Sequence, residues 1–175
     1  MKLFSLPSAS ATGLLCAGLL LGLGALLPAQ ASDTEDETSK EWQEAPLQLP
    51  ATPKPDNLIE FYRSASQLFA IDGSSISIAA DNSIRYTLVA TSGTGVKNIS
   101  YEAIRCDSYI RKLYAFGRPD GSWSPSRRNE WDRISTNGTN LPQHVLYTDF
   151  FCEGNTIAGK VPLLLRRFEA ARLRR

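Results

Sequence analysis

The chain has 175 residues, of which 42% are hydrophobic and 21% are charged, and its formal net charge is +1. Residues 1–31 contain one lysine and no acidic residue, so the remainder of the chain has no net charge. This balance argues against a broadly basic nucleic-acid-binding protein, and the length fits one domain with an ordinary core.

The first 31 residues have the layout of a secretory signal peptide. Lys2 gives a basic start, residues 14–27 are almost wholly apolar, and a small-x-small ending stops at Ala31, before polar Ser32. This layout predicts export and cleavage between Ala31 and Ser32. The apolar run is shorter than the ~20 residues that a membrane-spanning helix needs.

Cys16 offers an alternative, the acylated cysteine of a lipoprotein. That processing needs a small residue before the cysteine, whereas Leu15 stands there, and most of the apolar stretch would follow the cut. We therefore expect a periplasmic protein that loses Cys16 with its signal peptide. Lipoprotein anchoring at Cys16 is the less favoured hypothesis.

Two cysteines remain after cleavage, Cys106 and Cys152. In an oxidising compartment such a pair forms a disulfide most simply. A reactive thiol is one alternative, and a metal site that adds His144 and Asp149 is another, although no CxxC or HxxxH spacing supports it.

Residues 32–57 are predicted to be a disordered linker. The segment begins acidic and becomes proline-rich, and it has few branched apolar residues with which to form a core. Trp42 is the exception and is expected to pin the segment locally. The folded domain is then predicted to span residues 58–175.

Strands dominate the first part of this domain. Residues 58–62 are expected to form a strand or short helix, and alternation across residues 75–91 predicts a hairpin that turns at Asp81-Asn82. A third strand covers residues 97–106. Its apolar face switches near residues 103–104, which predicts either a bulge or a strand covered on both sides.

The second part changes from strand to helix. Residues 112–117 predict a further strand, residues 119–121 a turn, and Trp123 a short fifth strand. Residues 127–134 are expected to be helical or mixed, whereas residues 142–151 and 161–172 predict helices that begin near a proline. The fold class is therefore α+β, an antiparallel sheet of about four to five strands with C-terminal helices packed on one face.

Several segments together resemble one known family. They are Ser75-Ile76-Ser77-Ile78 and the stretches 84–89, 98–106, 114–117, 121–123 and 150–152, with Trp131. The chain resembles the cryptic neisserial protein one-like (CNP1-like) domain of exported betaproteobacterial proteins. The resemblance implies a single domain in the Gram-negative envelope and carries over no catalytic residue.

An enzymatic role has little support in the sequence. His144 with Asp149 would have to serve any serine nucleophile, and no G-x-S-x-G elbow is present. Glu102 lies within a predicted strand and needs a partner if it is buried. We expect a structural ion pair with Arg85, the alternatives being a solvated glutamate or a functional acid.

A mixture of aromatic and basic residues predicts a possible binding surface. Its members are Tyr101, Arg105, Tyr114, Trp123, Arg127, Arg128 and Trp131. The alternative is that most of these aromatic rings fill the core. The basic C-terminal helix could also contact anionic lipid headgroups.

These patterns predict a non-catalytic binding or structural component of the bacterial envelope, with a small hydrolase of envelope polymers as the alternative. We expect no cofactor, no metal, no nucleic-acid partner and no transmembrane segment after signal removal. The partner is expected to be an envelope protein or polymer.

Overall fold

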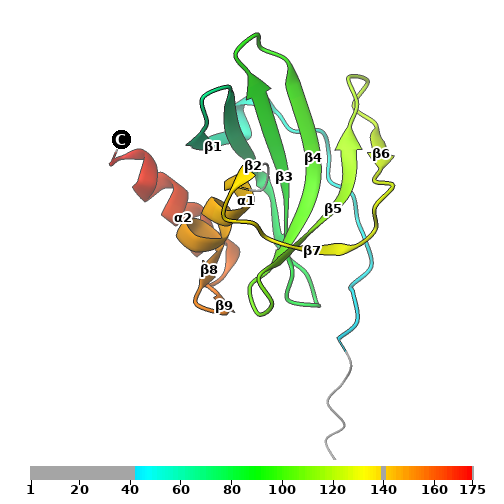
Figure 1. Ribbon diagram of the computed structural model, residues 1–175, viewed down its shortest axis with the longest axis vertical. Coiled ribbons are helices and arrows are strands. Elements are labelled where there is room, and N and C mark those ends of the chain that lie inside the picture. The colour runs from blue at the N-terminus through cyan, green and yellow to red at the C-terminus, as the bar shows by residue number, and fades with distance from the viewer. Residues whose placement is uncertain (1–41, 139–140, 175) are drawn as a thin grey trace, which may run out of the picture. The chain divides into compact units, whose positions relative to one another are not determined.

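The computed structural model describes residues 42–138 and 141–174 (Figure 1). The predicted signal peptide with Cys16, the cleavage site between Ala31 and Ser32, and residues 32–41 of the predicted linker lie outside the described residues.

The described residues contain one main antiparallel sheet of seven strands, in the spatial order β1-β2-β3-β4-β5-β6, with β7 also paired to β5 (Figure 1). A 3₁₀ turn, Pro55–Asn57, leads into the first strand. The strands are β1 (Leu58–Arg63), β2 (Gln67–Ile78), β3 (Ile84–Ser92), β4 (Lys97–Arg105), β5 (Ile110–Gly117), β6 (Trp123–Pro125) and β7 (Trp131–Arg133). Each of the first five strands pairs with the next one along the chain, so the sheet is a meander.

The α+β class is confirmed, but the sheet is larger than the predicted four to five strands. The strand β2 begins at Gln67, before the predicted hairpin, and β7 forms within residues 127–134, which were expected to be helical or mixed. Three residues are too few to show an alternating pattern, so pairing with β5 decides the conformation of β7.

The hairpin predicted over residues 75–91 is confirmed. The strands β2 and β3 meet at a turn in which the Ala79 N–H donates to the Ser83 carbonyl over 2.9 Å. Asn82 has a φ of 60°, a left-handed conformation that asparagine tolerates better than most residues.

Both explanations for the apolar switch in β4 apply. The pairing of β4 with β5 shifts between Tyr101 and Glu102, where Tyr114 is the extra residue of a β-bulge. Tyr101, Glu102, Ala103 and Ile104 are all buried, so both faces of this strand are covered.

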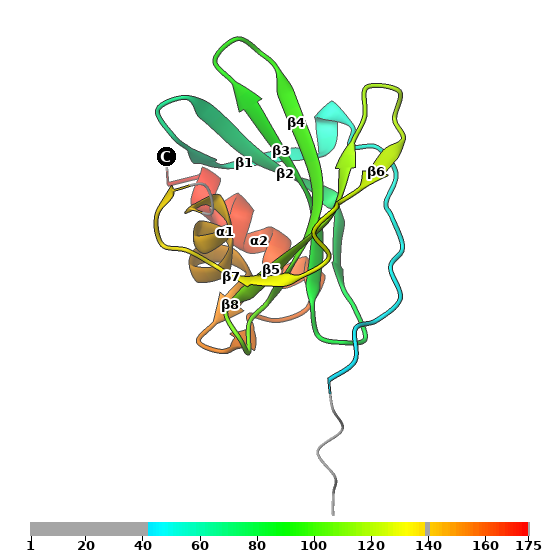
Figure 2. The same ribbon diagram turned by 45° about the vertical axis from the view of Figure 1, so that its right-hand side comes forward.

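The helices cover one face of the sheet (Figure 2). They are α1 (Leu141–Val145), the π-helix Leu146–Phe151 and α2 (Val161–Arg172), and a two-stranded sheet of β8 (Cys152–Glu153) and β9 (Thr156–Ile157) lies between the last two. The bounds of α2 agree with the prediction. The predicted helix over residues 142–151 is instead α1 followed by the π-helix.

The π-helix directs two consecutive aromatic rings into the core. Phe150 stacks on Phe168 of α2 with ring centroids 4.0 Å apart, while Phe151 lies 5.2 Å from Tyr86 of β3. Tyr86, Phe151 and Phe168 are almost fully buried, so these contacts join the helices to the centre of the sheet.

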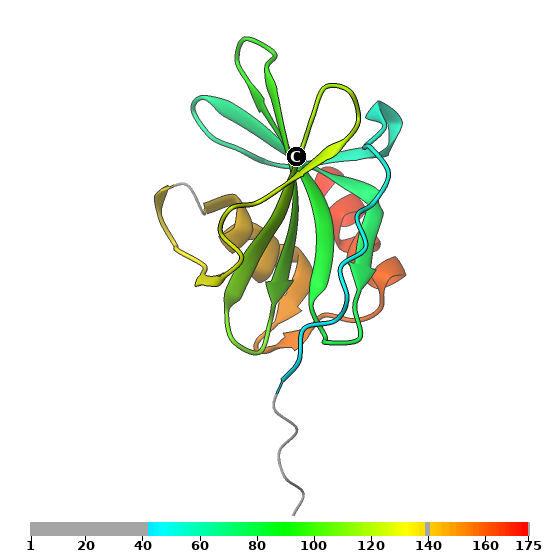
Figure 3. The same cartoon turned by 90° about the vertical axis from the view of Figure 1, so that its right-hand side faces the viewer.

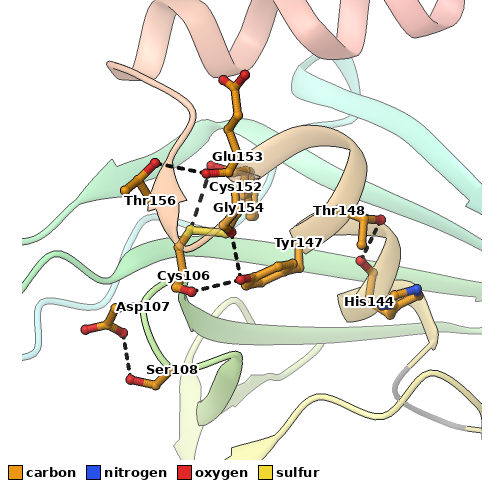
Figure 4. The surroundings of a disulfide bond; sticks show 11 residues. Cys106, Asp107, Ser108, His144, Tyr147, Thr148, Cys152, Glu153, Gly154 and Thr156 are labelled. Atoms are coloured by element: carbon orange, nitrogen blue, oxygen red, sulfur yellow. Dashed lines mark hydrogen bonds between the residues drawn. A yellow bond between two sulfur atoms is a disulfide. The ribbon is translucent and has the colours of Figure 1, made fainter.

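The predicted disulfide between Cys106 and Cys152 is present (Figure 4). It joins the residue after β4 to the residue after the π-helix, with Cα atoms 5.6 Å apart. The Tyr147 hydroxyl lies 2.8 Å from the Cys106 carbonyl oxygen and 2.9 Å from that of Gly154, within hydrogen-bonding distance of both. The bridge therefore holds the π-helix against the sheet.

Residues 42–57 lie along the opposite face of the sheet from the helices (Figure 3). The indole N–H of Trp42 donates to the Asp81 carbonyl over 3.0 Å, and that of Trp123 donates to the Pro50 carbonyl over 2.8 Å. This part of the predicted disordered linker is ordered against the sheet. Its composition did not indicate this, because several of the groups that hold it are the backbone carbonyls of Ala45, Pro46 and Pro50, and every sequence has such groups.

Candidate functional site

A cleft of about 470 Å³ lies beside β5, on the face of the sheet that the helices also occupy. Its lining has three arginines, two acidic residues, and several apolar and hydroxyl side chains: Arg111, Leu113, Phe116, Ser124, Pro125, Ser126, Arg127, Arg128, Glu130 and Asp132. In the β4–β5 register, Leu113 is opposite Glu102 and Phe116 is opposite Ser100, so these side chains share one face. The strands β6 and β7 pair with different halves of β5, and the connection between them forms the outer wall.

Glu102 lies buried beside this cleft, with 4% of its surface exposed. Its carboxylate accepts hydrogen bonds from the Ser100 hydroxyl at 2.7 Å, the Gln143 amide at 2.8 Å and the Tyr86 hydroxyl at 3.2 Å. The Arg111 guanidinium is 3.5 Å away and supplies the opposite charge. Three strands and α1 thus converge on one carboxylate.

The surroundings of Tyr86 favour its protonated form. Burial, together with the charge and hydrogen bond of Glu102, raises the pKa of Tyr86 well above its ordinary value, although Arg111 opposes the shift. The Tyr86 hydroxyl therefore keeps its proton at neutral pH and can donate it in the hydrogen bond to Glu102.

Within the part of the chain that the structure describes, two buried polar atoms next to Glu102 have no hydrogen-bond partner. They are the Nε of Arg111, a donor, and the Oε1 of Gln143, an acceptor. Buried polar atoms normally have a partner, and those without one often mark a place for water or a ligand. Arg111 also lines the cleft, so this residue contacts both the carboxylate and the open space.

Two more arginines line the wall of the cleft. Arg128 is 2.9 Å from Asp132 and 3.8 Å from Glu130, so its charge is largely satisfied. Arg127 is exposed. Phe116 is also exposed, at 48%, and adds an apolar surface. This arrangement is suited to an anionic group attached to an apolar or sugar body.

The predicted binding surface is divided between the two faces of the sheet. Arg127 and Arg128 are at the cleft, whereas the other members lie opposite the helices. There, Tyr101 and Tyr114 are buried in a second small core with Ala103 and Ala115, against which Trp123 and Trp131 pack. The alternative, that most of the aromatic rings are packed, agrees with the structure, although the core they fill is not the one beneath the helices.

Arg105 is also on this second face, where residues 42–52 cover it. Its guanidinium is 3.9 Å from the centre of the Trp42 ring, and it forms an ion pair with Asp107. The ring of Trp42 in turn contacts the edge of Trp131 at a centroid distance of 5.7 Å.

The ion pair predicted between Arg85 and Glu102 does not form. Arg85 is opposite Ala103 and Glu102 is opposite Tyr86, so the two side chains leave the sheet on opposite faces. Arg85 instead pairs with Asp81 at 3.4 Å, and Glu102 pairs with Arg111. The prediction identified the need for partners, but Arg85 and Glu102 are one position out of register with each other.

Sequence reasoning missed Arg111 and Gln143. The signal for Arg111 was in the β4–β5 hairpin, because its register places Arg111 opposite Ile104 and diagonal to Glu102. Gln143 carries no such signal, since α1 is remote from β4 in the sequence.

The residues considered for catalysis are otherwise engaged. The His144 ring nitrogen Nδ1 lies 2.7 Å from the Tyr109 hydroxyl, and no hydrogen bond from this ring to a serine occurs within residues 42–138 and 141–174. Asp149 accepts a hydrogen bond from the Thr148 hydroxyl at 2.9 Å. In the same part of the chain, no group of three His, Cys, Asp or Glu side chains could hold a metal ion.

A larger cleft, of about 630 Å³, lies between α2 and the π-helix. Arg166, Arg167 and Arg174 line it together with Asp149 and several apolar residues. These arginines come from one helix and its end, without a buried anion that orients them, so the cleft beside β5 is the better organised site. None of the described helices is long and apolar enough to cross a membrane.

Comparisons with known proteins support one assignment. Neither the curated proteins nor the solved structures include a match. The model of the CNP1-like family matches residues 37–169, which include the whole sheet and all but the end of α2, and the chain therefore belongs to the CNP1-like family.

Proposed function

We propose that this chain is an exported, non-catalytic binding protein of the bacterial cell envelope, and that the cleft beside β5 binds a carboxylate group of an envelope polymer. The observation that carries the proposal is the ion pair of Arg111 with the buried Glu102, in which Nε of Arg111 has no partner among the described residues. An arginine held in this way is pre-organised for a planar anion.

The envelope location is supported by the predicted signal peptide and by the disulfide, which persists in oxidising compartments. Peptidoglycan is an envelope polymer whose stem peptides carry several carboxylates and are attached to sugars, which suits the arginines and Phe116 of the cleft. No observation favours the hydrolase alternative, because the Glu102 carboxylate already accepts three hydrogen bonds.

Binding of soluble peptidoglycan fragments to the purified mature chain tests this proposal by titration calorimetry. Arg127→Gln removes an exposed cation from the cleft with little effect on folding, and we expect affinity to fall about tenfold, or about 1.4 kcal/mol. Arg111→Lys should weaken binding further, because an ammonium cannot bind a carboxylate in a bidentate fashion.

Arg63→Gln is the matched control, because Arg63 is exposed on β1 and does not line the cleft. Fragments whose carboxylates are amidated should bind weakly to every variant. The proposal fails if amidated and unmodified fragments bind equally well, or if Arg63→Gln weakens binding as much as Arg127→Gln.

A further inference from the structure

Residues 42–52, here called the strap, cross the face of the sheet opposite the helices without joining it as a strand (Figure 3). Buried side chains of the sheet bind the backbone of the strap. Arg85 donates to the carbonyls of Ala45 and Pro46, both at 2.7 Å, and Asp81 accepts the Ala45 N–H at 2.8 Å. The strap is therefore held as an extended peptide is held by a receptor.

The sheet residues that bind the strap, here called the groove, are Asp81, Arg85, Arg105, Lys112 and Trp123, and two of them are buried cations that need partners. Arg85 and Lys112 are each 4% exposed, and both are directed at the strap. Lys112 pairs with Glu44 at 2.6 Å, and Arg85 has Asp81 and two peptide carbonyls as partners. Without a peptide in place, Lys112 would lose the only ion pair found for it among the described residues, at a high cost for a buried cation.

The strap itself contributes little to the core. Trp42, Leu47 and Leu49 are 36%, 45% and 44% exposed, and no residue of the strap is buried. Only two of its side chains make specific contacts with the groove near Arg85: Trp42, which stacks on Arg105, and Glu44, which pairs with Lys112. A groove that mainly binds backbone atoms accepts other sequences that share these few features.

We propose that this groove is a peptide-binding site which the strap occupies as an internal ligand. Its partner is an extended, proline-containing segment of another exported protein, with an aromatic residue followed two positions later by an acidic one, as in Trp42-x-Glu44. The acidic side chain pairs with Lys112, Arg85 binds two successive carbonyls, and the indole of Trp123 binds a third. This site is on the other face of the sheet from the cleft, so it does not depend on carboxylate binding there and shares with the proposed function only the export of the chain.

The strap competes with such a partner because both bind the same atoms. A segment tethered next to its own site has an effective concentration in the millimolar range. A partner segment supplied separately must therefore bind poorly to the unaltered chain, and must bind better when the strap is weakened and the groove is left intact.

A labelled peptide with the sequence of residues 42–52 tests the proposal by fluorescence anisotropy on the full mature chain. In Glu44→Gln the strap loses its ion pair and the groove is unchanged, so we expect the peptide to bind at least tenfold more tightly than to the unaltered chain. Trp42→Ala weakens the strap at a second point and should have the same effect. Leu47→Ala removes an exposed strap side chain and should change nothing.

Two further controls test whether the gain in peptide affinity comes from binding in the groove. A peptide with glutamine in place of its glutamate should lose most of the gain, and so should the double variant Glu44→Gln, Arg85→Gln. The proposal is overturned if a scrambled peptide binds equally well, or if neither strap-weakened variant binds the peptide more tightly. A concentration-dependent dimer of the unaltered chain would also overturn it, because a second copy would then be the occupant.

Discussion

Glu102 and Arg111 illustrate how much a single buried charge depends on its neighbours. The carboxylate has three hydrogen-bond donors and one cation around it, and each comes from a different part of the chain. Removing one partner of such a group leaves the others buried without compensation, which costs more than the contact itself contributes.

We therefore expect Glu102→Gln to lower the free energy of unfolding by about 2 kcal/mol. The amide keeps the shape of the side chain but leaves Arg111 without its counter-charge. Urea denaturation followed by tryptophan fluorescence measures the change. Glu130→Gln, which alters an exposed residue, is the control and should leave the unfolding midpoint where it is. An unchanged midpoint for Glu102→Gln would show that the carboxylate has no structural role.

The hydrogen bond that the Asp81 carboxylate accepts from the strap should weaken at acidic pH. Burial alone would raise the pKa of Asp81, but hydrogen bonds from the Ser83 hydroxyl and from the Ala45 and Ser83 N–H groups, with the charge of Arg85, lower it below 3.8. A carboxyl whose pKa is lowered by folding contributes stability above its unfolded pKa, and this contribution is lost as the pH falls through the folded value.

Comparison of the unaltered chain with Asp81→Asn at a series of pH values tests this effect. The difference in unfolding free energy should be constant from pH 7 to about pH 5 and should shrink as the pH falls below about 4. If the difference stays the same down to pH 2, the stabilisation by Asp81 does not depend on its ionisation.

Among the helices and strands, the sequence predicted those that local periodicity or turn residues identify. The bounds of α2, Val161–Arg172, and the hairpin turn near Asp81 follow from spacing and from turn residues. The strand β7 could not be predicted, because it has three residues and exists through its pairing with β5. The partners of Glu102 depend on the register of three strands and on the docking of α1, which no local pattern records.

For the candidate site, the sequence predicted the types of residue involved but not which face of the sheet each one occupies. Arg127 and Arg128 were assigned to a binding surface and do line a cleft, whereas Tyr101 and Tyr114 were assigned to the same surface and are buried. Aromatic residues serve both roles, and which face a strand residue occupies changes with a single bulge, here the one at Tyr114.

The disulfide connects β4 to the π-helix, and its removal tests how much the helices depend on it. Cys106 and Cys152 are 46 residues apart, for which the chain-entropy model gives a stabilisation of about 4 kcal/mol. We expect the double variant Cys106→Ser, Cys152→Ser to lose about this amount in urea denaturation under non-reducing conditions. Addition of a reductant should destabilise the unaltered chain and leave the double variant unaffected.

At the scale of the whole molecule, the sheet separates two surfaces of different character. One carries the helices and the cleft with its arginines, and the other carries the strap over a small aromatic core. The two proposals share one premise, because both proposed partners lie in the compartment to which the predicted signal peptide would direct this chain.

Processing of the exported chain tests this location. We expect the protein recovered from the periplasm to begin at Ser32, since the predicted cut follows Ala31. Mass spectrometry of the intact protein should show that N-terminus together with the loss of two hydrogen atoms for the disulfide. A mass that includes Cys16 with attached acyl chains would establish the lipoprotein alternative.

Because both faces of the sheet are covered, few of its positions should accept substitutions during evolution. In β3, six successive residues from Ile84 to Val89 are buried, since the helices cover one side and the strap the other. Most strands in an antiparallel sheet can vary at every second position, which is where they meet solvent. In β3 no such solvent-facing positions occur between Ile84 and Val89. Neutral substitutions should therefore accumulate at the hairpin tips and on the outer side of α2, and the sequence in the middle of the sheet should change most slowly.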